Sequence, residues 1–200
     1  MLTDIAAALP YQTILFDYNQ YDESTNTLTV APLTEQAKKL YEVITRVRTK
    51  NPDATIDLIC HSQGCVVVGL AQPTGLRKII LLAPPARLNA EQMIRIFGSR
   101  PGTHLDLAGI SSFPRRDGST TLVPKAYWTS IKNVDPISLF NQLAGQVTVS
   151  LIQANQDEVI GGAGFSKLTP AIEIISIDAN HDFTGPAREQ LIKVINQEMA

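Results

Sequence analysis

The sequence lacks several features that would point to a membrane, to disulfide-rich secretion or to nucleic acid. It contains two cysteines among 200 residues, which is too few for a disulfide framework. Its 17 basic and 19 acidic residues leave no basic excess to attract nucleic acid, and no apolar run approaches the roughly 20 residues that span a bilayer. We therefore expect a cytoplasmic protein with neither a nucleic-acid nor a membrane partner.

What the sequence does contain is enough apolar material for one core. At 44% hydrophobic residues, a chain of this length can fold as a single domain, which we take to cover residues 1–200. Apolar runs of strand length alternate with stretches of helical periodicity. This alternation predicts a mostly parallel sheet covered by helices on both faces, a three-layer α/β fold.

The alternation also locates the individual elements. Helices are expected between Pro32 and Asn51, over residues 65–71 and over residues 186–199. The apolar runs predict strands at residues 13–16, 55–60, 78–83, 147–152 and 172–177.

Residues 85–145 break this rhythm. They are rich in glycine and proline and contain the single tryptophan, Trp128, while Asp117-Gly118 predicts a hairpin turn. Long connections without a purpose are uncommon. We therefore expect a small cap inserted over the strand ends, with a long irregular connection as the alternative.

Ser62 is the strongest candidate for chemistry. The predicted strand 55–60 runs into it and a predicted helix follows at once, which is the context of a nucleophile elbow. Such a turn needs small residues two positions before and after the serine, and here these are Cys60 and Gly64. The backbone N–H of Gln63, at the start of the helix, is placed to bind a developing oxyanion. The alternative is a serine that only caps the helix.

A serine nucleophile needs a base within hydrogen-bond reach. The sequence contains three histidines. His61 adjoins Ser62 on the turn, so its ring should point elsewhere, and His104 lies in the irregular insertion. His181 follows the predicted strand 172–177, where a catalytic histidine belongs, and is the expected base.

The base in turn needs an acid that orients it. This acid should follow the preceding strand, 147–152. Asp157 stands in that loop and is the expected acid, with Glu158 as the second choice. Both residues would also suit a plain solvated turn.

These motifs resemble those of the α/β-hydrolase superfamily, and most of all those of small bacterial acyl esterases of the cinnamoyl and feruloyl type. Residues 60–65, CHSQGC, are similar to the G-H-S-Q-G-G elbow of these esterases, and residues 81–86, LLAPPA, to a strand like LLAPAA that follows it. Loops 153–160 and 179–183 resemble their acid and histidine loops. The resemblance covers nearly the whole chain and implies an α/β-hydrolase fold with a cap over an acyl pocket.

The N-terminal part departs from the family pattern. In the family, a strand ending in His-Gly precedes the first helix, and its loop supplies a second oxyanion N–H. No such pair stands near the start of this sequence, and residues 17–24 are similar to the loop after the family's fourth strand. We therefore expect a fold that lacks the N-terminal strands. The open edge beside strand 13–16 would then lead to a homodimer or to poor solubility.

Together these observations predict a serine hydrolase that cleaves carboxylic esters of small acyl substrates through an acyl-enzyme. No metal or organic cofactor is expected, and a zinc site at the elbow is not expected because the turn cannot bring its cysteine and histidine side chains together. The alternative from another class is a catalytically weak or inactive protein that keeps the fold as a ligand pocket. The expected nucleophile, base, acid and oxyanion donor are Ser62, His181, Asp157 and the N–H of Gln63.

Overall fold

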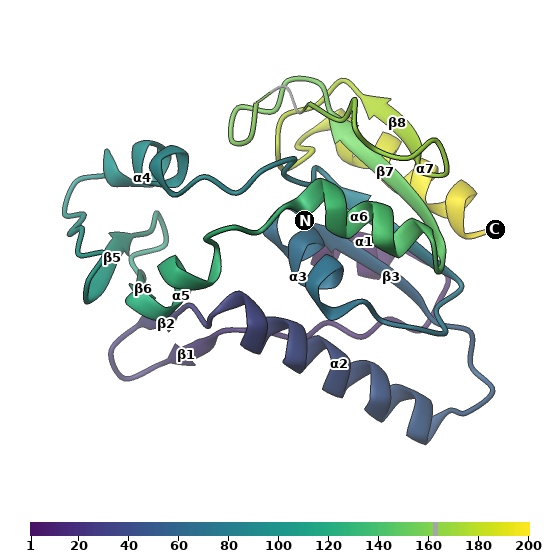
Figure 1. The fold of residues 1–200 in the computed structure, drawn as a ribbon, viewed down its shortest axis with the longest axis horizontal. Helices are drawn as coiled ribbons and strands as arrows, with labels where there is room; N and C mark the ends of the chain where they lie inside the picture. The colour runs from purple at the N-terminus through teal and green to yellow at the C-terminus, as the bar shows by residue number, and fades with distance from the viewer. Residues whose placement is uncertain (162–163) are drawn as a thin grey trace.

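The central feature of the fold is a parallel sheet of four strands. The computed structural model describes residues 1–161 and 164–200. Neighbouring strands follow the order β3–β4–β7–β8, and every pair is parallel (Figure 1). All carboxyl ends therefore lie at one edge, where the loops after the strands meet. The strands are β3 (Asp57–His61), β4 (Lys78–Leu82), β7 (Thr148–Ala154) and β8 (Glu173–Ile177).

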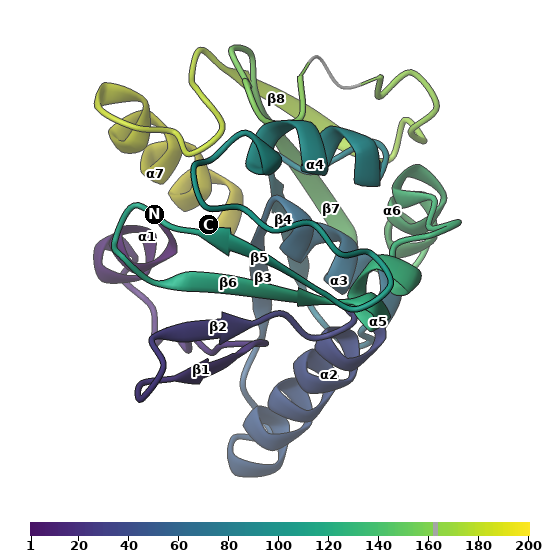
Figure 2. The same ribbon diagram turned by 90° about the vertical axis from the view of Figure 1, so that its left-hand side faces the viewer.

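Helices cover both faces of this sheet, as Figure 2 shows from the side. The longest helix, α2, forms because its apolar residues recur at helical spacing and make one buried stripe, which includes Leu33, Leu40 and Ile44. One face of the sheet carries α2 (Leu33–Lys50), α3 (Gln63–Ala71) and α6 (Pro136–Ala144), and the other carries α1 (Leu2–Ala8) and α7 (Pro186–Met199).

The side chains of the sheet alternate between two apolar cores. On β4, Ile79 and Leu81 face the core under α2, α3 and α6, whereas Ile80 and Leu82 face the core under α1 and α7. Gly69 lets α3 approach α6 closely, because a Cβ there would lie 2.9 Å from the Cβ of Leu139. The three-layer α/β fold expected from the sequence is therefore confirmed. Within the described ranges, no helix combines the length and apolar character that crossing a bilayer needs.

A second, smaller sheet lies at one end of the molecule. Its strands follow the order β1–β2–β6–β5, and β2–β6 is its one parallel pair. The β5–β6 hairpin expected at Asp117-Gly118 is present, and Gly118 takes a positive φ of 83° in its turn. The elements of this region are β1 (Gln20–Asp22), β2 (Thr27–Thr29), α4 (Ala90–Gly98), β5 (Ile110–Pro114), β6 (Thr120–Pro124) and α5 (Lys125–Ser130).

Residues 85–145 divide between these two parts of the molecule. α4, β5, β6 and α5 stand to one side of the main sheet (Figure 1), whereas α6 packs against α3 and β7. The hairpin β1–β2 was not expected from the sequence, and it joins the smaller sheet by pairing with β6. A cap that extends over the whole of 85–145 remains a prediction.

The prediction of a strand at residues 13–16 is wrong. These residues form no strand, and β3, at the edge of the main sheet, has β4 as its sole neighbour among the described residues. A strand forms only where a second strand satisfies its N–H and C=O groups. Ile14 and Leu15 are 53% and 54% exposed, so the apolar run that predicted a buried strand lies largely in solvent. The homodimer stays a prediction.

Candidate active site

Ser62 occupies a strained turn between β3 and α3. Its φ of 53° and ψ of −128° are unusual for any residue but glycine. Two hydrogen bonds hold the turn: the N–H of Ser62 donates to the carbonyl of Leu82 on β4 (2.9 Å), and the N–H of Cys65 donates to the carbonyl of Ser62 (3.0 Å). The strand–serine–helix arrangement expected from the sequence is present.

Small residues, Cys60 and Gly64, flank this turn, but the space around Gly64 is larger than expected. Cys60 is buried at the end of β3, and its thiol contacts the Ile80 carbonyl at 3.6 Å. A Cβ on Gly64 would lie 3.8 Å from the Cβ of Cys60, which is an ordinary van der Waals contact. The passage of strand and helix therefore leaves room for a small side chain at position 64 and does not require glycine there.

The structure brings Ser62, His181 and Asp157 into one hydrogen-bonded row. The loop after β8 places His181 with Nε2 2.9 Å from the Ser62 hydroxyl oxygen. The loop after β7 places an Asp157 oxygen 2.7 Å from Nδ1 of His181. An ionised carboxylate only accepts, so Nδ1–H donates to Asp157 and Nε2 is left to accept from the serine hydroxyl. His181 and Asp157 are buried, whereas Ser62 is reached from outside.

The electrostatics of Asp157 favour its charged form. Burial opposes the charge, but the hydrogen bonds from His181 and from the backbone N–H groups of Ile160 (2.8 Å) and Val159 (2.9 Å) outweigh it and lower the pKa of Asp157. Glu158, the second choice from the sequence, accepts from the backbone N–H of His181 at 3.1 Å. The imidazole is therefore oriented by Asp157, while Glu158 holds the main chain beside it.

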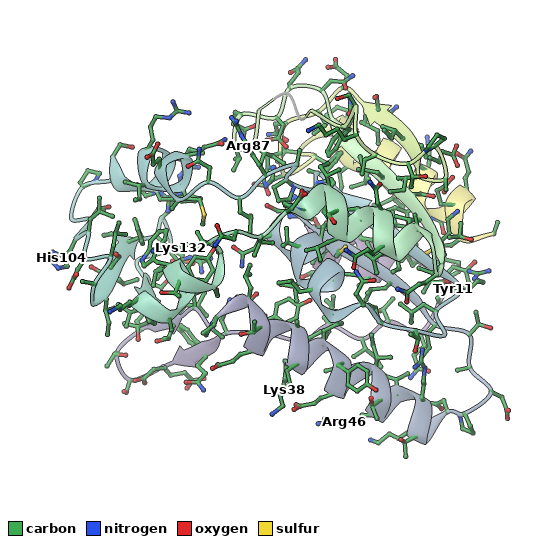
Figure 3. All side chains as sticks on the ribbon, in the orientation of Figure 1. Tyr11, Lys38, Arg46, Arg87, His104 and Lys132 are labelled. Atoms are coloured by element: carbon green, nitrogen blue, oxygen red, sulfur yellow. The ribbon has the colours of Figure 1, made fainter. Side chains whose placement is uncertain are left out.

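His61 has a structural role that the sequence analysis missed. Its Nε2–H donates to the backbone carbonyl of His181 at 2.9 Å, and the two rings lie 4.7 Å apart. Burial lowers the pKa of His61, so the neutral ring that makes this contact is favoured. The position of His61 next to Ser62 was the one feature of the sequence that could have indicated this role, because it places the His61 side chain near the residues that contact the serine. His104, by contrast, lies at the far end of the smaller sheet (Figure 3).

A mostly apolar pocket opens beside Ser62. Its volume is about 140 Å³, and α4 forms one wall with Met93, Ile96 and Phe97. Val159 and Ile160, from the loop that carries Asp157, form another. Arg87 lies on the connection between the main sheet and α4 (Figure 3) and is the single charged residue among the described residues that line the pocket. A small acyl group would fit against these walls with its carbonyl near the serine.

The residues described offer no cluster of three or more histidine, cysteine, aspartate or glutamate side chains that would hold a metal ion. Both cysteines are buried and unpaired by disulfide. The polar groups that do converge are those of the serine row.

Comparisons with known proteins agree with this architecture. Residues 18–109, a little under half of the chain, match the family model of the T6SS Tle3 phospholipase effector domain. Est1E from Butyrivibrio proteoclasticus, a protein also solved with ferulic acid bound, is 19% identical; the match covers 84% of this chain and 70% of Est1E with a TM-score of 0.62. No curated protein sequence matches the chain.

Two further solved structures are similar to the chain. An esterase domain of a Rhodothermus marinus protein is 15% identical, over 80% of this chain and 67% of that one, with a TM-score of 0.58. An alpha-beta serine hydrolase homologue from Coxiella burnetii is 16% identical, over 86% of this chain and 62% of that one, with a TM-score of 0.51. The chain has the α/β-hydrolase fold.

The lowered pKa of His61 predicts a pH-dependent stability. The folded state favours the neutral ring, so stability is full above the unfolded pKa of about 6.5 and decreases as the pH falls below it. One proton accounts for up to about 1.4 kcal/mol per pH unit in this window. We expect the free energy of unfolding, measured with urea between pH 7.5 and 5, to decrease with falling pH. Asp157 contributes below about pH 4, outside this window, because its folded pKa is lowered.

The matched variant is His61→Gln, whose amide N–H can still reach the His181 carbonyl but does not titrate. Its free energy of unfolding should depend less on pH than that of the unmodified chain. Equal pH slopes in the two proteins would contradict the role given to His61.

Proposed function

We propose that the chain is a serine hydrolase that cleaves carboxylic esters of small acyl substrates. The observation that carries this proposal is the row from Ser62 through His181 to Asp157, with hydrogen bonds of 2.9 and 2.7 Å. It begins on a strained elbow and opens into an apolar pocket. A serine that merely caps a helix would have no reason to meet a buried histidine and carboxylate.

The geometry supports acyl transfer in two halves. Ser62 Oγ attacks the ester carbonyl while Nε2 of His181 takes its proton, and Asp157 stabilises the imidazolium that forms. The tetrahedral adduct collapses as His181 gives the proton to the leaving alcohol, which leaves an acyl-serine. Water then attacks this acyl-enzyme with its proton passing to His181. The proton returns to Ser62 Oγ as the acid departs.

The developing oxyanion needs donors that do not have to reorganise. Gln63 is the first residue of α3, and helices leave their first N–H groups without partners inside the helix. Its N–H, aided by the helix dipole, is the proposed oxyanion donor.

The pocket supports an acyl group as substrate, and the comparisons support an ester of it. The pocket walls are mainly aliphatic, with one aromatic ring from Phe97, which suits an acyl group. The family model is named for a phospholipase domain and one of the similar structures for an esterase domain; both names denote enzymes that cleave esters. Arg87 on the lining is compatible with an anionic leaving group near the ester.

A catalytically weak ligand-binding protein is the second candidate. It is favoured by residues 13–16, which form no strand, and by residues 1–24, which contain no His-Gly pair of the kind that supplies a second oxyanion donor. Loss of one such donor costs on the order of 10²–10³ in kcat. The two candidates differ in turnover, which the following variants measure.

Replacement of Ser62 by alanine should abolish hydrolysis of p-nitrophenyl butyrate. Removal of the nucleophile from a triad lowers kcat by about 10⁴ or more, while circular dichroism should show an unchanged fold. Ser99→Ala, at an exposed position after α4, is the matched control and should keep full activity. A Ser62→Ala protein that retains more than about a tenth of the activity would rule out this nucleophile.

Asp157 and Glu158 should differ sharply when each loses its charge. Asp157→Asn disturbs the tautomer of His181 and should lower kcat by about 10⁴, whereas Glu158→Gln keeps an oxygen to accept from the His181 N–H and should cost about tenfold or less. Steady-state kinetics on the same ester give both values. The reverse order of effects would mean that Glu158 is the acid.

A further inference from the structure

A line of polar side chains joins α5 to the elbow. The hydroxyl of Tyr127, on α5, donates to the side-chain oxygen of Gln63 at 2.5 Å. The side-chain nitrogen of Gln63 in turn points to the oxygen of Gln36, on α2, at 3.5 Å. The Gln36 amide donates onward to the carbonyl of Ala31 at 2.7 Å. Gln63 is therefore held from both sides by residues far from it in sequence.

The outer members of this line are well buried. Tyr127 and Gln36 are each 2% exposed, so neither can replace a lost partner with bulk water. Burial also raises the pKa of Tyr127, which keeps its hydroxyl protonated as a donor. Breaking the Tyr127–Gln63 hydrogen bond is costly because it leaves the buried Tyr127 hydroxyl unsatisfied.

The position of Tyr127 is itself fixed. The next turn of α5 carries Ser130, whose hydroxyl donates to the Tyr127 carbonyl at 2.7 Å and accepts from the N–H of Leu33 at 3.0 Å. This ties α5 to the start of α2. The Tyr127 ring packs edge-on against Trp128, with ring centroids 5.6 Å apart. The Tyr127 hydroxyl therefore contacts Gln63 from a side chain whose position is fixed by its neighbours.

We infer that Tyr127 is a positioning residue for the oxyanion donor, acting through the side chain of Gln63. This inference rests on the proposed function and deepens it. Gln63 follows Ser62, whose φ of 53° is strained, and the peptide between the two residues carries the N–H that would meet the oxyanion. Fixing the Gln63 side chain at both of its polar atoms limits rotation of that peptide.

The same contact links the pocket wall to the elbow. The Tyr127 hydroxyl lies 3.9 Å from the sulfur of Met93, and both Met93 and Gln63 line the pocket. An acyl group that contacts Met93 on α4 would therefore also affect Tyr127, the residue that holds Gln63. Tyr127 touches no reacting atom, and its effect passes through Gln63.

Tyr127→Phe removes the hydroxyl alone and is the first test. With p-nitrophenyl butyrate we expect kcat to decrease about tenfold, less than the 10²–10³ for a whole oxyanion donor, and KM to change less than twofold. Binding of a trifluoromethyl ketone, which forms an oxyanion on the serine, should weaken by the same factor as kcat/KM. Tyr41→Phe is the matched control, because Tyr41 is 57% exposed on α2, and it should behave as the unmodified enzyme.

A double-mutant cycle tests whether Tyr127 acts through Gln63. Gln63→Met keeps the length of the side chain and its backbone N–H but removes the amide. If Tyr127 acts through that amide, Tyr127→Phe should lower kcat about tenfold in the native background and have almost no effect in the Gln63→Met background. Additive effects on kcat would overturn the inference.

The outcomes separate this inference from the proposed function. If the unmodified chain hydrolyses the ester and Ser62→Ala does not, but Tyr127→Phe keeps full kcat, the inference fails and the proposed function stands. A Tyr127→Phe protein with a raised KM, a lowered melting temperature and an unchanged kcat would mean that the contact only holds α5 in place. If the unmodified chain has no activity that depends on Ser62, the proposed function itself fails.

Discussion

The site depends on one backbone constraint, the positive φ of Ser62 between β3 and α3. A non-glycine residue in this region costs about 1–3 kcal/mol, and it persists only where the surroundings over-determine it. Here the Leu82 carbonyl holds the serine N–H from the neighbouring strand, while α3 begins at the next residue. The turn lifts the hydroxyl above the edge where all four parallel strands end, and every other part of the site is arranged around it.

The parallel sheet then supplies the partners of the serine. The loops after β7 and β8 leave the same edge, so Asp157 and His181 meet there although 24 residues separate them along the chain. His61 and Glu158 fix the His181 main chain through its carbonyl and its N–H, while Asp157 fixes the ring. Each contact restricts the motion of His181 and so keeps its Nε2 within hydrogen-bond distance of Ser62. α5 and α2 add the last restraint, on the residue after the serine.

The sequence was informative where a local pattern determines structure. The strands β3, β4, β7 and β8 were predicted from their continuous apolar runs, and Ser62, Asp157 and His181 each follow such a run. β8, at the edge of the sheet, carries this pattern although most of its residues are exposed. Residues 13–16 carry the same apolar pattern and form no strand, because pairing depends on a neighbour that no local pattern reveals. The contacts of Tyr127 and Gln36 could not be predicted either. They join residues up to 64 positions apart, and nothing in single-sequence spacing reports such proximity.

The central claim is that Ser62 is a nucleophile made reactive by the fold around it. Intact-protein mass spectrometry after treatment with a fluorophosphonate, followed by peptide mapping, tests this most directly, because phosphonylation requires an activated hydroxyl and does not depend on the natural substrate. We predict one adduct per chain, located on the peptide that contains Ser62, and none when the protein is unfolded in urea before treatment. An unlabelled folded protein, or an adduct on another residue, would contradict the account.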